Sequence, residues 1–539
     1  MRKLYYGGDI ITMEKADDAA EAVLTENDIV KKVGRLTEFQ DMMNDSSIEK
    51  IDLKGNTLMP GFVDPHSHIS MVGQIASMAD LSTCKTFNEI IQTLKLYMQN
   101  NGAGKEDYII GFGYDHNILK EREHPKKDVL NQVSADNPIV IFHASGHMGC
   151  VNDAALKMAG IDENTPDMEG GHIGRKEETG KPDGYLEEGN FMSIQSSLPS
   201  DMGMDQLEAF NKGQEIYIRN GITTAQDGAT SHETLELLKA VADQERLKLD
   251  VVAYPLVAEN PEDIKNNEEY VKKYHNSLKI GGYKMFLDGS PQGRTAWLTE
   301  PYEGEESYCG YPRYQDEQVK EYVSRAINDG MQLLTHCNGD AASGQLLRNY
   351  ESALQESDNP DKQRLRPVMI HCQTVRNDQL DKMAELSMIP SIFVSHTYYW
   401  GDVHLKNLGR KRGSLISPAE SAFRKGLMVN FHQDSPIVKP DMLDAIWCGV
   451  NRLTRKGTNI GSEECVTVYE GLKAATINAA YSYFEEDQKG SIKEGKFADL
   501  VILDKNPLKM DKMKINEIQI EETIKEGKTI YKSESVLTE

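Results

Sequence analysis

The sequence lacks long apolar runs, paired cysteines and an excess of basic residues, and each absence argues against a class of protein. No stretch approaches the about 18 uninterrupted apolar residues of a membrane-spanning helix. The 7 cysteines are odd in number and form no C-x-x-C pair, which favours free thiols in a reducing compartment. The 60 Lys and Arg against 85 Asp and Glu leave a net charge of −25, which disfavours nucleic acid and anionic membranes as partners.

Several common catalytic motifs are also missing. The chain has no G-x-S-x-G nucleophile elbow, no Walker phosphate loop and no G-x-G-x-x-G turn after a strand. Its first residues carry two positive charges but no apolar run long enough for a signal peptide. With 39% hydrophobic and 27% charged residues, the chain can bury a substantial core. We therefore expect a cytoplasmic enzyme that acts on a small molecule.

The middle of the chain alternates short apolar runs with helical stretches, a pattern typical of βα units around a parallel sheet. The candidate strands, in chain order, are 58–64, 222–226, 247–254, 282–287, 332–336, 367–371, 389–394 and 427–432. Eight strands with intervening helices predict an α/β fold, a (β/α)8 TIM-like barrel. The active site of such a barrel lies at the carboxyl ends of its strands.

Both ends of the chain have patterns typical of β-strands, and a long gap separates the first two strands of the predicted barrel. Neither end alone holds enough strands for a stable sheet, so we expect a small composite β-sandwich domain built from both termini. The predicted domains are residues 1–57 and 481–539 for this composite domain and 58–480 for the barrel. About 150 residues separate the first two barrel strands, too many for one βα connection, which predicts a large insertion at about 70–220.

Residues that bind metals fall at the predicted strand ends. His66 and His68 follow the first strand, and their alternate positions put both imidazoles on one face, where they can bind one ion. His336 ends the fifth strand, His371 ends the sixth, and Asp434 follows the eighth. A single histidine at a strand end is most often structural. Four histidines and an aspartate at four strand ends indicate a metal centre.

Lys284 is the unusual member of this group, because it lies within an apolar strand where a charged amine is costly unless it is paired. Burial lowers the pKa of a lysine and frees the neutral amine as a nucleophile. Such an amine can combine with carbon dioxide to give a carbamate whose two oxygens bridge two cations. The alternative is an ordinary ion pair between Lys284 and Asp288.

The set of His66-x-His68, Lys284, His336, His371 and Asp434 resembles the metal site of the amidohydrolase superfamily. More narrowly, the chain resembles the amidohydrolase-3 or YtcJ-like branch, which includes N-substituted formamide deformylases. Further matching segments are residues 58–64, 145–147, 151–152, 284–290 and 490–500. Together these motifs are specific, whereas any one of them alone is not.

The resemblance implies a role for each residue of the set. His66 and His68 would hold one metal, His336 and His371 a second, and carbamylated Lys284 would bridge the two. Histidine ligands imply zinc or a similar divalent ion, because magnesium and calcium prefer sites made only of oxygen atoms.

Asp434 would both bind metal and act as the proton shuttle. A bound cation lowers the pKa of its water to about 7, so that metal-bound hydroxide can attack a carbonyl at neutral pH. The family often has Gly-Ser-Asp where this chain has His432-Gln433-Asp434, so His432 would reshape the pocket or add a ligand. The number of ions, one or two, is left open by this departure.

Three further residues are candidates for substrate contacts. His147 lies in a glycine-flanked loop of the insertion, and His396 follows the seventh strand. Both are candidates for the catalytic set together with His371 and Asp434. Arg294 follows the fourth strand and would bind a substrate carboxylate or an oxyanion. Hydrogen-bonded scaffolding is the competing interpretation for all three side chains.

The sequence therefore predicts a metal-dependent hydrolase that cleaves a C–N bond of an amide, N-acyl or formamide type. One alternative is a deaminase of an aminated heterocycle with one metal on the same scaffold. A second alternative is a catalytically silent metal-binding or regulatory protein, which has no need to retain Asp434. A homodimer supported by the small terminal domain is a further expectation.

Overall fold

The computed structural model describes residues 1–17, 19–102, 104, 107–144, 146, 148–168, 171–197 and 205–534, with the backbone alone at 195–197. The chain divides into two compact units. Unit 1 comprises Met1–Ile69 and Gln214–Glu539, and unit 2 comprises Ser70–Gly213. In the described part of the chain, every helix is too short or too polar to cross a lipid bilayer.

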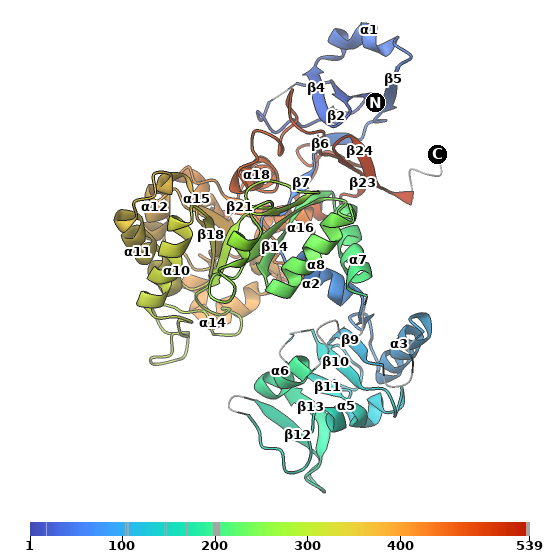
Figure 1. Cartoon of the computed structure of the whole chain (residues 1–539), viewed down its shortest axis with the longest axis vertical. Helices are drawn as coiled ribbons and strands as arrows, with labels where there is room; N and C mark the ends of the chain where they lie inside the picture. The colour runs from blue at the N-terminus through green and yellow to red at the C-terminus, as the bar shows by residue number, and fades with distance from the viewer. Residues whose placement is uncertain are drawn as a thin grey trace. The chain divides into compact units, whose positions relative to one another are not determined.

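Two parallel sheets form the centre of unit 1 (Figure 1). The first runs in the order β16-β15-β14-β7, and the second in the order β17-β18-β19-β20-β21. Their strands are β7 (Phe62–Val63), β14 (Ile222–Thr230), β15 (Asp250–Pro255), β16 (Leu278–Ile280), β17 (Gly282–Phe286), β18 (Gln332–Cys337), β19 (Val368–His371), β20 (Ile389–Ile392) and β21 (Asn430–Phe431). A parallel bridge between Leu256 and Lys284 links the two sheets.

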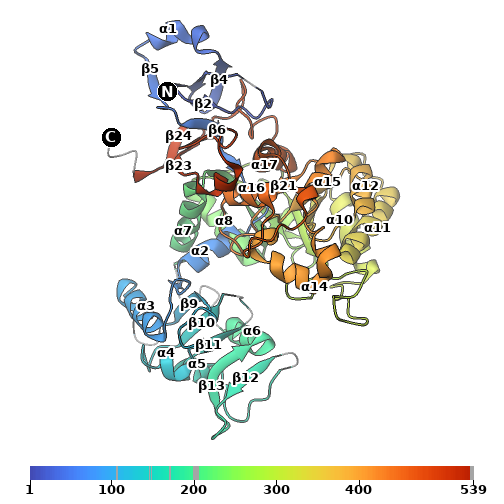
Figure 2. The same ribbon diagram turned by 180° about the vertical axis from the view of Figure 1, so that it is seen from behind.

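Helices cover the outer side of the second sheet, as Figures 1 and 2 show from opposite sides. They include α10 (Asp316–Asn328), α11 (Asp340–Glu356) and α12 (Asn377–Glu385), which follow β17, β18 and β19 along the chain. The strands are buried along most of their length, as expected where both faces of a parallel sheet are covered. This alternation of strands and helices confirms the predicted α/β class.

The sheets differ from the prediction in two places. The predicted strand 58–64 is two strands, β6 (Thr57–Pro60) and β7, which pair with β22 and β14 in different sheets. Gly61 between them passes so close to Thr223 that a Cβ atom there would lie 2.5 Å from the Thr223 methyl group. The chain therefore leaves one sheet at Gly61 and enters another. The sequence also did not predict β16 as a separate strand. Among the described residues the two parallel sheets remain open, so a closed barrel stays a prediction.

Unit 1 has two further sheets, one built from the N-terminal segment alone and the other from both ends of the chain. One has the order β4-β3-β1-β5, from β1 (Arg2–Tyr6), β3 (Ala22–Glu26), β4 (Ile29–Gly34) and β5 (Ile48–Asp52). The other has the order β2-β6-β22-β23-β24, from β2 (Asp9–Ile10), β6, β22 (Leu500–Leu503), β23 (Ile520–Lys525) and β24 (Lys528–Lys532). Tyr5, Val23 and Leu500 belong to one hydrophobic core, so residues from both ends pack together.

Unit 2 has a sheet and a core of its own. The sheet runs β12-β13-β11-β10-β9-β8, from β8 (Ala79–Asp80), β9 (Ile109–Tyr114), β10 (Ile139–His143), β11 (Met148–Val151), β12 (His172–Arg175) and β13 (Pro182–Glu187). Ile110 and Val140 pack into one hydrophobic cluster, and Ile109 and Ile141 into another. Because neighbouring residues of a strand point to opposite faces, the two clusters cover the two faces of this sheet.

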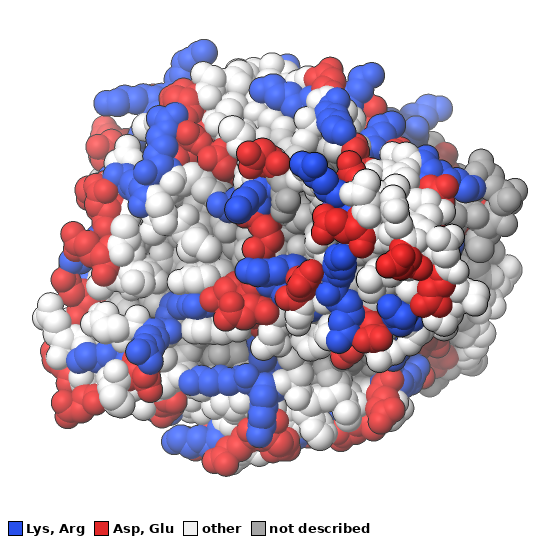
Figure 3. Space-filling model, turned by 90° about the horizontal axis from the view of Figure 1, so that it is seen from above, with Lys and Arg blue, Asp and Glu red and all other residues white. Residues whose placement is uncertain are grey.

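Charged side chains are mixed on the face of the molecule drawn in Figure 3. Over the described residues of that face, Lys and Arg alternate with Asp and Glu and do not gather into a continuous basic surface.

A buried network of charges joins the C-terminal segment to the first parallel sheet. Lys489 forms ion pairs with Asp250 at the start of β15 and, at 2.9 Å, with Glu485. Lys525 of β23 lies 3.0 Å from the same Asp250 carboxylate. Burial alone raises the pKa of Asp250, but Lys489 and Lys525 outweigh this effect and lower the pKa to about 2. Since the ordinary pKa of an aspartate is 3.8, this stabilisation is present above about pH 4 and is lost as the pH falls toward 2.

We expect Lys489→Met to lower the free energy of unfolding by about 3 kcal/mol, the low end for breaking a buried ion pair, because Asp250 and Glu485 lose this partner but keep Lys525 and Lys279. Lys509→Met is the matched control, since Lys509 is 68% exposed in its ion pair with Asp9. Its expected cost is at most about 1 kcal/mol. Urea denaturation followed by circular dichroism measures both values. Equal midpoints for the two variants would show that the buried network does not hold the segment in place.

Candidate metal centre

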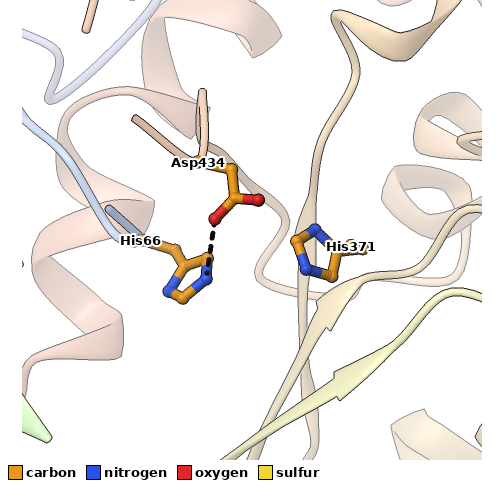
Figure 4. Close-up of side chains that lie close together, drawn as sticks. All are labelled: His66, His371 and Asp434. Atoms are coloured by element: carbon orange, nitrogen blue, oxygen red, sulfur yellow. Dashed lines mark ion pairs between the residues drawn. The ribbon is translucent and has the colours of Figure 1, made fainter. Parts of the chain in front are cut away.

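The six predicted ligands lie in or just after the parallel strands of unit 1. His66 and His68 come after β7, and the others lie in or just after β17, β18, β19 and β21, at Lys284, His336, His371 and Asp434. Because parallel strands end at the same edge of a sheet, residues far apart in the sequence meet there. Figure 4 shows the side chains of His66, His371 and Asp434 turned toward one another.

The carboxylate of Asp434 lies at the centre of one half of this group. Its Oδ1 atom lies 3.2 Å from Nε2 of His66 and 3.3 Å from Nε2 of His68. The Nζ atom of Lys284 lies 3.4 Å from Nε2 of His66. The structure thus brings these four side chains, which span the first, fourth and eighth predicted strands, into direct contact.

The other half of the group is a pair of histidines. Nε2 of His371 lies 2.9 Å from Nδ1 of His336, and the centroid of the His371 ring lies 5.7 Å from that of His66. One ligand atom each from His66, His371 and Asp434 lies within 4.8 Å of the others, a spacing that suits a shared ion. All six predicted ligands therefore lie in one cluster.

Burial favours the neutral form of four basic groups of the cluster, His66, His336, His371 and Lys284. Burial and the nearby Lys284 lower the pKa of His66 to about 4 and that of His336 to about 3. Burial, followed by His336, holds the pKa of His371 well below its ordinary value. Burial also lowers the pKa of Lys284 to about 7. Neutral imidazole is the form that binds a metal, and a neutral amine is the form that combines with carbon dioxide.

Asp434 is the charged member of the cluster. Burial acts to raise its pKa, but hydrogen bonds from His66 and His68 outweigh this effect and hold the pKa well below its ordinary value. The site therefore contains one anionic carboxylate together with the neutral imidazoles of His66, His336 and His371. Such a set of donors fits a divalent cation of the zinc type.

Unsatisfied polar atoms provide a direct test of whether a metal fits. Within the described residues, Nδ1 of His371 and both ring nitrogens of His432 are buried and make no hydrogen bond. Buried polar atoms of this kind usually have a partner, or mark an ion or water. The His432 ring lies 5.0 Å from that of His66 and 5.2 Å from that of His371. His432 is therefore part of the cluster, as its place in the sequence suggested.

The backbone at the cluster is strained. His371 has φ of 75° and Asp434 has φ of 51°, and both values lie in the left-handed region that side chains other than glycine rarely adopt. Strain of this kind is concentrated at functional sites, where the surrounding structure holds it in place.

Several supporting residues escaped the sequence analysis. Oε1 of Gln226 lies 2.6 Å from Nδ1 of His66, and Nδ2 of Asn338 lies 3.0 Å from Nε2 of His336. Such partners fix the orientation of a ligand ring. A single Gln or Asn carries no pattern in the sequence, so only its position in the fold reveals this role.

The alternative of an ion pair between Lys284 and Asp288 is wrong. Asp288 accepts hydrogen bonds from the backbone N–H groups of Trp297, Asn338 and Gly339, at 2.9, 3.0 and 2.7 Å. Its carboxylate therefore organises the loop after β18, and the Lys284 amine lies beside His66 instead.

Two of the three predicted substrate contacts, His396 and Arg294, lie in the described part of the chain, and their surroundings differ. His396 is buried, its Nδ1 atom lies 3.1 Å from Nε2 of His404, and its ring lies 4.5 Å from that of Phe393. Arg294 forms an ion pair with Glu305 at 2.7 Å, where both side chains are exposed to solvent. His147 lies outside the described residues. A role in substrate binding stays a prediction for all three.

Comparison with known proteins agrees with this geometry. The Bacillus subtilis (strain 168) protein named "Putative amidohydrolase YtcJ" is 27% identical over 98% of this chain and 99% of its own length. The N-substituted formamide deformylase of Arthrobacter pascens is 25% identical over 97% of both chains. The crystal structure of an uncharacterized metal-dependent hydrolase from Pyrococcus horikoshii has a TM-score of 0.79 at 23% identity, covering 95% of this chain and 99% of that chain, and so shares the fold.

The sequence model of the amidohydrolase family, Amidohydro_3, matches residues 49–531. This match begins within β5 and spans both parallel sheets, all of unit 2 and the six clustered side chains. The chain belongs to the amidohydrolase family and is a hydrolase.

Proposed function

We propose that the protein is a metal-dependent amidohydrolase that cleaves a C–N bond of an amide, N-acyl or formamide type. The observation that carries the proposal is the cluster of four histidines, Lys284 and Asp434 at one edge of the parallel sheets. The kinship with an N-substituted formamide deformylase supports the bond type. The proposal includes a closed (β/α)8 barrel at 58–480 and a composite β domain from 1–57 and 481–539.

The proposed metal ligands are His66, His68, His336, His371 and Asp434. A divalent cation, zinc above all, supplies Lewis acidity at this position by acidifying water and polarising a carbonyl oxygen. Asp434 is anionic and takes the proton of the attacking water at its carboxylate. It then delivers this proton to the departing amine, first as a general base and then as a general acid.

Lys284 is proposed to carry a carbamate. A pKa of about 7 leaves a large fraction of its amine neutral at neutral pH, ready to combine with carbon dioxide. The product has two oxygens and a negative charge in place of an amine, and these oxygens can be shared by two cations. We therefore propose that the centre holds two metal ions when Lys284 carries the carbamate.

A deaminase of an aminated heterocycle is the second candidate. His66, His371 and Asp434 form a group compact enough for a single ion, which is the number that this alternative requires. A screen of N-acyl amino acids, formamides, hydantoin-like rings and aminated heterocycles, with zinc, manganese or cobalt, separates the two. Amine release from N-acyl compounds or formamides supports the amidohydrolase. Ammonia release from the heterocycles alone would replace it with the deaminase, and turnover of none would favour a silent metal-binding protein.

Removal of the metal is expected to abolish turnover and to destabilise unit 1. A ligand at 100 times its dissociation constant stabilises the folded state by about 2.7 kcal/mol, so chelation should lower the melting temperature measurably. Zinc added back should restore both properties. The measurements are activity and differential scanning fluorimetry before and after treatment with EDTA. Full activity in protein that mass spectrometry shows to be free of metal would contradict the proposal.

We also propose a class of substrate, its contacts, a location in the cell and an oligomeric state. A small molecule is the proposed substrate, with His147, His396 and Arg294 as its contacts and with His371 and Asp434 in the catalytic set. A cytoplasmic location and a homodimer are proposed on the sequence alone.

A further inference from the structure

A second group of metal-binding side chains lies in unit 2, at the carboxyl ends of two parallel strands. Asp115 and His116 directly follow β9, and His143 is the last residue of β10. The two strands pair in parallel, and a register shift at His143 places it opposite Tyr114. His116 and His143, 27 residues apart, therefore meet at one edge of the sheet.

The polar atoms of this group are spaced as the ligands of one ion would be. Nδ1 of His116 lies 3.2 Å from Nε2 of His143. Oδ1 of Asp115 lies 3.6 Å from the same nitrogen and 4.0 Å from Nδ1 of His116. Ligand atoms about 2.0–2.2 Å from a tetrahedral zinc ion lie about 3.3–3.6 Å apart. Shifts of a few tenths of an ångström would therefore suffice to surround an ion.

Neighbouring residues hold these ligands in place. The backbone N–H and the side-chain amide of Asn117 donate to Oδ1 of Asp115 at 2.8 and 3.1 Å. The ring of His124 stacks on that of His116 with centroids 4.1 Å apart, and its Nδ1 atom lies 3.0 Å from the hydroxyl of Tyr114. Partners of this kind fix the orientation of ligands in metal sites.

We propose that Asp115, His116 and His143 form a binding site for a divalent transition-metal ion, built from unit 2 alone. Two imidazoles and one carboxylate suit zinc, cobalt or iron(II) and do not suit magnesium or calcium. The side chains of Asp115 and His116 are each 29% exposed, so an ion can reach the site from solvent. Water or a further group completes the coordination. This site is additional to the centre of unit 1 and does not depend on the proposed reaction.

The test measures zinc per chain in the full-length protein after equilibrium dialysis against zinc, by inductively coupled plasma mass spectrometry. His116→Gln is expected to lose one zinc per chain, because loss of a ligand weakens binding by more than the about 10- to 100-fold that loss of an outer partner costs. His172→Gln is the matched control in the same unit, where His172 is exposed and pairs with Asp167 at 3.2 Å. The control is expected to keep the wild-type zinc content.

Two further variants keep the outcome decisive. Asp115→Asn retains an oxygen that can accept the Asn117 hydrogen bonds, so it preserves the local fold if His116→Gln does not fold. It removes the negative charge from a group of three candidate ligands and is expected to lose the same zinc ion. His371→Gln removes a ligand from unit 1, and its loss of zinc should add to that of His116→Gln. Wild-type zinc content in both His116→Gln and Asp115→Asn would overturn the unit 2 site. Wild-type zinc content in His371→Gln alone would count against the proposed function instead.

Discussion

Asp434→Asn is expected to lower kcat by about 10²- to 10⁴-fold while the protein keeps most of its metal. The asparagine oxygen can still contact His66 and His68, but the amide cannot take up and release a proton at neutral pH. Loss of a general acid–base catalyst has an effect of this size. Steady-state kinetics and the metal content of the same preparation measure the two properties separately.

Asp378→Asn is the matched control for this experiment. Asp378 makes an ion pair with Arg376 at the start of α12, and its side chain is 70% exposed. Its replacement should leave kcat and metal content unchanged. If Asp434→Asn kept wild-type turnover with full metal content, the role of Asp434 as proton shuttle would be refuted.

Lys284→Ala is expected to lose activity that short carboxylates restore. The substitution removes both the amine and any carbamate formed on it, and metal-ion catalysis supplies several kcal/mol, which corresponds to about 10²- to 10⁴-fold in rate. Added formate or acetate can enter the vacated space and place two oxygens where the carbamate had them. The measurement is kcat as a function of carboxylate concentration.

Lys320→Ala is the control, since Lys320 lies on α10 and makes an ion pair with Glu356 at 2.6 Å, where the Glu356 side chain is 62% exposed. It should retain activity and show no response to carboxylates. Full metal occupancy of Lys284→Ala without rescue would favour an unmodified lysine and a single ion, and would remove the carbamate from the proposal.

The strands and the metal ligands were predictable from the sequence because two independent patterns coincide. Strands buried on both faces appear as short apolar runs, so β18 and β19 were found close to their observed positions. His336 and His371 lie at the ends of these runs, where a parallel sheet places functional groups. The expectation that they approach the pair of His66 and His68 follows from the topology and not from distance along the chain.

Other features depend on tertiary contacts that leave no pattern in the sequence. The division between β6 and β7 reflects their pairing with different strands, and Gly61 between them passes close to Thr223, a residue more than 160 positions away. Gln226 acts on His66 through one side-chain contact, and glutamine has no typical spacing that would identify this role.

The unit 2 cluster was missed for a related reason. His116 and His143 lie in the insertion, to which the strand-end rule of a barrel did not apply, so residue type was the only available signal. The pairing of β9 with β10 supplies the missing information, because it brings the ends of two strands together.

The most direct test of the metal centre is a crystal structure of the zinc-loaded protein with an anomalous difference map at the zinc absorption edge. We predict a peak within about 2.0–2.2 Å of ligand atoms from His66, His68 and Asp434, or from His336 and His371. A map that shows zinc elsewhere and no peak among these five side chains would contradict the account.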